Sequence, residues 1–217
     1  MDSQPWIAAT ITTSSRVFDL SKQDPFEITV KLMLHNSRPI TFKERSTAIF
    51  NSLLLYEGGL TIKNTVTGQK IRRGSLHLCF ESSNSDGTPT PQTQRDFITL
   101  IPGKEHVVQD SLNPIPAYPC FPTQGLSTQE IDERRERGRT WKWMNVATLE
   151  DGQVYELGID ENAAVRTWMQ GSVAGILEAK KLGLRPGIIS GEIRFIVEEP
   201  ARFEVMRPDA DGSLNWP

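Results

Sequence analysis

Apolar and polar residues alternate with a period of two along much of this chain. The pattern is clearest over residues 26–34, where every second residue from Phe26 to Leu34 is apolar. A segment with this period forms a strand that buries one face and exposes the other. Weaker forms of the pattern predict strands at 60–66, 76–80, 97–101, 106–112, 154–159, 191–197 and 201–206.

Turn residues separate the predicted strands. Gly58-Gly59, Thr67-Gly68 and Pro102-Gly103 supply the backbone conformations that tight turns need. A proline-rich stretch over residues 113–122 is expected to be a connector. Because no strand–helix alternation recurs, the pattern favours a mainly β fold, an antiparallel β-sandwich of the immunoglobulin or arrestin-like kind with one or two short helical insertions.

Two segments carry helix signals. Residues 127–138 begin with the capping-box pattern Ser127-Thr-Gln-Glu130 and contain almost no apolar residue except Ile131, which is typical of a solvated insertion. Residues 172–182 place Val173, Ile176 and Leu177 on one face, so this helix is expected to pack against the sheet. Together with a polar loop at 81–95, these insertions fit a single domain over residues 1–217.

Four segments carry a family resemblance: residues 17–30, 59–63, 96–104 and 149–157. They resemble uncharacterised fungal proteins with an arrestin-like or immunoglobulin-like β-sandwich. The resemblance implies a fold and a fungal setting, and it carries over no catalytic residue.

The sequence argues against nucleic acids and membranes as partners. The chain has 24 basic and 27 acidic residues, a net charge of −3, so it lacks the positive field that nucleic acids attract. No segment approaches the roughly 20 apolar residues that span a bilayer, and the first residues lack a secretory signal pattern. Only Cys79 and Cys120 are present, which favours free thiols and a cytoplasmic location.

Motifs for common chemistry are missing from the sequence. It has no glycine-rich phosphate loop, no nucleophile elbow and no C-x-x-C pair, so we predict no cofactor. His35, His77 and His106 are too dispersed for a local ligand motif, and we predict no metal site.

Aromatic residues provide the best candidates for a ligand site. Trp141 and Trp143 are two positions apart and would share one side of an extended segment, and Trp168 follows later. Indoles line ligand pockets and also fill cores, so both roles stay open. The other candidate ligand-binding residues near them in sequence are Tyr155, Asp160 and Arg166.

Two functions therefore follow as hypotheses. The first is a cytosolic binding or scaffold module that engages a protein partner through sheet edges or loops. The second is a cofactor-independent enzyme of the cyclase or isomerase type, acting on an apolar small molecule in fungal secondary metabolism. A closed, indole-lined cavity of roughly 300 Å³ or more would favour the enzyme, and a filled core with an apolar surface patch would favour the module.

Overall fold

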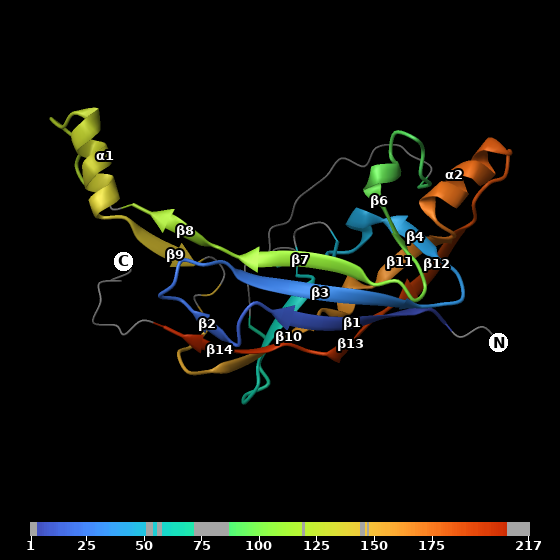
Figure 1. Ribbon diagram of the computed structural model, residues 1–217, viewed down its shortest axis with the longest axis horizontal. Coiled ribbons are helices and arrows are strands. Elements are labelled where there is room, and N and C mark those ends of the chain that lie inside the picture. The colour runs from blue at the N-terminus through green and yellow to red at the C-terminus, as the bar shows by residue number, and fades with distance from the viewer. Residues whose placement is uncertain are drawn as a thin grey trace.

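The computed structural model describes residues 4–50, 54–55, 58–71, 87–118, 120–143, 146 and 148–207. These residues form fourteen strands and two α-helices, which confirms the mainly β prediction. The strands make three four-stranded sheets and one two-stranded sheet, and most neighbouring strands are antiparallel. The molecule is elongated, with one helix near each end (Figure 1).

The first sheet, sheet A, has the strand order β13-β1-β3-β7. Its strands are β1 (Trp6–Thr13), β3 (Phe26–His35), β7 (His106–Leu112) and β13 (Phe195–Glu199). The β3 strand alternates buried and exposed residues as its sequence predicts. The pairing of β1 with β13 is parallel, which the prediction of a purely antiparallel fold did not include.

The second sheet, sheet B, has the order β2-β14-β10-β5. Its strands are β2 (Val17–Asp19), β5 (Leu60–Asn64), β10 (Val154–Ile159) and β14 (Arg202–Met206). Here β14 runs parallel to β2, and the other pairs are antiparallel.

Sheets A and B contribute to one hydrophobic core. Phe18 of β2 stacks on Phe26 of β3 with ring centroids 4.5 Å apart, and Phe26 lies 5.2 Å from Phe203 of β14. All three rings are buried. Burial of such large apolar surfaces is the main favourable term in folding, so this core holds the two sheets together.

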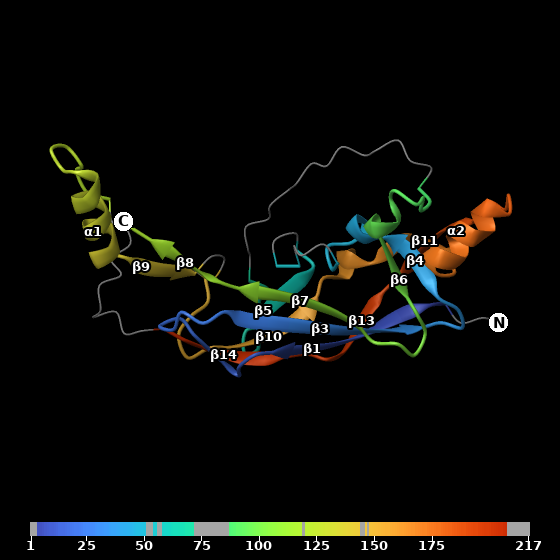
Figure 2. The same cartoon turned by 45° about the horizontal axis from the view of Figure 1, so that its top comes forward.

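The third sheet, sheet C, has the order β12-β11-β4-β6 and lies at the end of the molecule that carries α2 (Figure 2). Its strands are β4 (Ile40–Lys43), β6 (Phe97–Leu100), β11 (Val165–Gln170) and β12 (Ile188–Ile193). The α2 helix (Val173–Lys181) packs on this sheet through Ile176 and Val173, which contact a small cluster with Phe97 and Met169. The predicted packing of this helix is therefore confirmed.

A hairpin projects from the opposite end of the molecule (Figure 1). It consists of β8 (Pro114–Ala117) and β9 (Thr140–Trp143), with α1 (Thr128–Arg137) between them in the chain. The predicted capping box is present: the Ser127 hydroxyl accepts from the Glu130 N–H, and the Glu130 carboxylate accepts from the Ser127 N–H. No residue of α1 is buried, as expected for a solvated insertion.

Two expectations about strands were wrong. The stretch 113–122 was expected to be a connector, but it contains β8. Pro114 and Pro116 alternate along that strand, so both missing N–H groups fall on the same edge, where the pairing with β9 does not need them. The stretch 191–197 was expected to form one strand, but it spans the end of β12 and the start of β13, which belong to different sheets.

Part of the sequence prediction lies outside the described residues. The strand expected at 76–80 and the first part of the loop expected at 81–95 belong to this group. Residues 87–93 form turns and irregular structure, in agreement with a loop.

Candidate functional site

The residues predicted to bind a ligand are distributed over several parts of the fold. Tyr155 is buried in the core, where its hydroxyl accepts a hydrogen bond from the Glu150 N–H at 2.9 Å. The side chain of Trp141 lies outside the described part of the structure. The strands that carry Trp143 and Trp168, β9 and β11, lie at opposite ends of the molecule (Figure 1).

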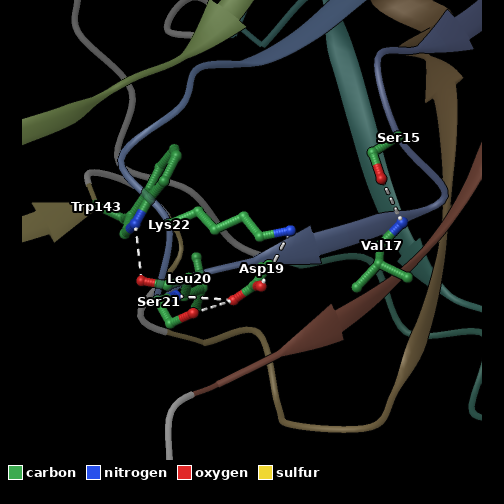
Figure 3. A network of polar contacts seen from close by, with 7 residues as sticks. All are labelled: Ser15, Val17, Asp19, Leu20, Ser21, Lys22 and Trp143. Carbon is green, nitrogen blue, oxygen red and sulfur yellow. Dashed lines mark hydrogen bonds and ion pairs between the residues drawn. The ribbon is translucent and has the colours of Figure 1, made fainter.

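Trp143 anchors the β8–β9 hairpin to the core. Its ring meets Phe18 edge to face, with centroids 4.8 Å apart, and its Nε1–H donates to the Leu20 carbonyl at 3.2 Å (Figure 3). The turn that presents this carbonyl is fixed by Asp19, whose carboxylate accepts from the Ser21 hydroxyl at 2.6 Å and the Ser21 N–H at 3.0 Å. The Ser21 hydroxyl, above all, holds the pKa of Asp19 below its usual value. Trp143 therefore has apolar and polar contacts that explain it as a structural residue.

Trp168 has an unsatisfied polar atom. Its indole packs against the core, but Nε1 is buried and has no hydrogen-bond partner in the described structure. Trp168 pairs across the sheet with Ile189 of β12, and a Cβ placed on the nearby Gly191 would lie 3.9 Å from Nε1. Buried donors almost always have an acceptor, so the indole N–H of Trp168 is an unusual, unsatisfied donor beside β12.

The edge of β12 is the second unusual feature beside Trp168. We use the term β12 edge for Ile188, Ile189, Ser190 and Gly191. Among the described strands, β12 is outermost in sheet C, and Ile188, Ile189 and Ser190 pair with β11 alone. Ile188 and Ile189 are 45% and 36% exposed. An edge strand with free N–H and C=O groups and exposed apolar side chains is a template for pairing with another chain.

The other edge strands of the three four-stranded sheets differ from the β12 edge in charge or burial. A charged residue lies within β2, β5, β7 and β13, while β6 presents buried residues at both ends. The charged residues on these edges are Asp19, Lys63, Asp110, Glu198 and Glu199. Charges on an edge strand oppose pairing with a second chain. The β12 edge has no such protection until Glu192.

The segment of the chain that contains the β12 edge is rich in basic residues. Residues 164–194 contain five basic and two acidic residues, although the whole chain has a net charge of −3. Both acids have a basic partner: Glu178 pairs with Lys181 at 2.6 Å, and Glu192 pairs with Arg194 at 3.3 Å. This segment therefore has three more basic than acidic residues, while Asp160 and Glu161 lie directly before it in the chain.

A pocket of about 330 Å³ lies where β12 passes into β13, and we call it the Arg166 pocket. Its lining residues are Asp160, Glu161, Asn162, Ala164, Arg166, Glu192, Arg194 and Phe195. They come from the 3₁₀ turn Glu161–Ala163, from β11, and from the chain around the junction of β12 and β13. Two residues predicted from the sequence, Asp160 and Arg166, meet here.

Most charges in the Arg166 pocket are compensated. The Asp160 carboxylate accepts from the N–H and the side-chain amide of Asn162 and lies 3.8 Å from the Lys70 ammonium. Glu192 is paired with Arg194. Arg166 and Glu161 have no ion pair or side-chain hydrogen bond with any described residue. One positive and one negative group are therefore available to a ligand.

The described histidines are separate from this site. His35 stacks on Trp6 with ring centroids 3.8 Å apart, and both line a second pocket of about 460 Å³. His106 lies beside Phe50, and burial lowers its pKa. The described residues contain no group of three potential metal ligands, and His77 is outside them.

Sequence reasoning missed the β12 edge, Glu161 and Arg194. The Ile188-Ile189 pair is visible in the sequence, but only the sheet order shows that it lies on an edge.

No helix in the described structure is long and apolar enough to cross a membrane. Comparisons with protein-family models, with curated proteins and with solved structures find no match to this chain.

Proposed function

We propose that this protein is a binding module whose β12 edge accepts an extended segment of a protein partner as an additional strand of sheet C. The observation that carries the proposal is the β12 edge, which no second described strand pairs and which exposes Ile188 and Ile189. In strand addition, main-chain hydrogen bonds supply affinity, and contacts with alternate side chains supply specificity.

The charge around the β12 edge defines the chemistry of the partner. Because basic residues predominate over residues 164–194, a segment that alternates apolar and acidic residues complements this surface. Two copies of this chain would bring two basic surfaces together, which charge repulsion opposes. The proposed partner is therefore a different protein with an acidic, apolar segment.

The proposal also includes a specific type of β-sandwich and a cellular location for the protein. The common core of sheets A and B supports an immunoglobulin-like or arrestin-like β-sandwich. The free thiol of Cys120 supports a cytoplasmic module. Such sandwiches commonly bind protein partners by their edges and loops.

The alternative function, an enzyme acting on an apolar small molecule, has less support among the described residues. The candidate acid Asp160 lies in a pocket with five charged residues, and Tyr155 and Trp143 are engaged in the core. No tryptophan lines the Arg166 pocket, so it is not the indole-lined cavity that would favour an enzyme.

The test measures binding of labelled peptides of about six residues to the full chain. We expect a peptide that alternates glutamate and valine to bind, and a matched lysine–valine peptide to bind at least tenfold more weakly. Binding should shift the amide resonances of Ile189 and Gly191 and the indole N–H resonance of Trp168. An interaction that leaves these resonances unchanged would place the peptide elsewhere and contradict the proposal.

A matched pair of variants tests whether peptide binding depends on the β12 edge or on any exposed apolar side chain. Ile188→Thr removes an exposed apolar side chain from the β12 edge but keeps a residue that favours strands. Ile196→Thr makes the same change on β13, at a residue that is 48% exposed. We expect the first variant to weaken binding severalfold and the second to leave it unchanged. Equal losses would exclude β12 as the specific site.

A further inference from the structure

We infer that the Arg166 pocket binds a free α-amino acid with an apolar side chain. The inference does not depend on the β12 edge, because it is based on a different set of residues and on a small ligand. Three properties of the pocket point to this class: its pair of available opposite charges, its apolar residues and its size.

The charges identify the two ends of the ligand. The carboxylates of Asp160 and Glu192 are already occupied by Lys70 and Arg194. Arg166 is available to a carboxylate, for which the planar guanidinium fork offers two parallel hydrogen bonds. Glu161 is available to an ammonium group. A ligand with only one of these charges would leave the other pocket residue without a partner.

The remaining lining identifies the rest of the ligand. Phe195 is half-buried and adds apolar surface to the lining, and Ala164 is small and buried beneath it. A volume of about 330 Å³ is at the lower limit for small-molecule sites, which suits a single amino acid better than a larger metabolite. A zwitterion with an apolar side chain satisfies both the charges and the apolar surface.

The experiment uses the full chain and compares three related compounds by NMR titration and calorimetry. Phenylalanine carries both charges, 3-phenylpropionate lacks the ammonium group, and 2-phenylethylamine lacks the carboxylate. We expect phenylalanine to bind at least tenfold more tightly than either analogue and to shift the amides of Asn162 and Arg166. If the three compounds bind equally, or if phenylalanine causes no shift at millimolar concentration, the inference is wrong.

Variants that each remove one charge test which pocket residue binds the carboxylate and which binds the ammonium group of the amino acid. Arg166→Gln should abolish the advantage of phenylalanine over the amine, and Glu161→Gln should abolish its advantage over the acid. Arg185→Gln is the control, because Arg185 is an exposed arginine outside the pocket. All three changes are at exposed positions, and equal denaturation midpoints would show that folding is intact. Loss of binding in the control to the same extent would show that general charge, and not the pocket, holds the ligand.

The result of the amino-acid titration can be distinguished from the result of the peptide-binding test of the proposed function. Binding of the acidic peptide is read from β12 amides and is sensitive to Ile188→Thr, while amino-acid binding is read from Asn162 and is sensitive to Glu161→Gln. Each can therefore succeed or fail alone.

Discussion

The two α-helices of this protein begin in the same way but relate to the fold differently. In α1 and α2 alike, a serine at the N-cap accepts a hydrogen bond from a backbone N–H three residues later, and basic residues occupy the last turn. The difference is in burial: α2 places Ile176 against sheet C, whereas α1 buries no residue. The helices lie near opposite ends of the molecule (Figure 2).

This difference shows that the residues at the ends of a helix and the apolar residues along it have different roles. Caps and terminal charges determine where a helix begins and ends, because they satisfy its unpaired backbone groups. An apolar stripe determines whether the helix is attached to the rest of the fold. We therefore expect α2 to contribute to global stability, and the hairpin that carries α1 to depend on its base at Trp143.

The largest expected effect is at that base. Trp143→Ala removes the edge-to-face contact with Phe18 and the hydrogen bond to Leu20, and we expect it to destabilise the protein by about 3 kcal/mol. The measurement is the free energy of unfolding from denaturant titration. Trp143→Phe keeps an aromatic ring and should cost less than half as much. A negligible effect of Trp143→Ala would show that the hairpin is attached by other contacts.

A smaller loss is expected on the α2 side. Ile176→Ala removes a buried side chain from the cluster with Phe97 and Met169, and we expect a loss of about 2 kcal/mol, at the low end for such changes because the cluster is small. Thermal or denaturant unfolding measures it. The control is Ala174→Gly, at an exposed position of the same helix, which should cost about 1 kcal/mol from propensity alone. If the control costs as much, α2 is stabilised by its backbone and not by its packing.

The regular elements were predictable where one physical signal dominates. The β3 strand follows from its alternation, β10 from the same pattern, and both helices from their caps and charge order. The β1 and β11 strands were not predicted. Ile7, Ala8 and Ala9 are consecutive buried residues, and β11 has an irregular register with β12, so neither strand shows a clean period of two. The β8 strand was hidden by prolines that an edge position tolerates.

The candidate sites were predictable only in part. Asp160 and Arg166 were selected because they are near in sequence to the tryptophans, yet it is Glu192, Arg194 and Phe195 that complete their pocket. These residues come from a distant segment that the fold brings alongside β11. The β12 edge depends on which strand lies outermost in sheet C, and strand order is a property of long-range pairing that no local pattern encodes.

At the tip of the hairpin, a large-to-small change should have little effect. Ile131 is the only large apolar residue of α1 and is not buried, so we expect Ile131→Ala to cost less than about 1 kcal/mol. The same denaturant titration that measures Ile176→Ala makes the comparison direct. A loss of several kcal/mol would show that α1 packs into an interface, and the comparison of the two helices would have to be revised.

The smallest expected effect is a local pH dependence of α1. The Glu130 carboxylate accepts hydrogen bonds from the Ser127 N–H at 2.8 Å and the Ser127 hydroxyl at 2.7 Å, and these bonds, with the backbone bond first, hold the pKa of Glu130 below its usual value. A carboxyl group whose pKa is lowered by folding stabilises the folded form above its ordinary pKa, and that contribution disappears as the pH falls through the lowered value. The first turn of α1 should therefore be intact at neutral pH and should fray only in acid, while α2, whose Ser172 cap has no acidic partner in the first turn, should show no such change. NMR titration of the Ser127 amide resonance measures the midpoint, and Glu130→Gln provides the control, because glutamine can fill the same capping position without titrating. A midpoint at or above the ordinary value for glutamate, or a pH dependence that persists in Glu130→Gln, would mean that the capping box does not control the start of this helix.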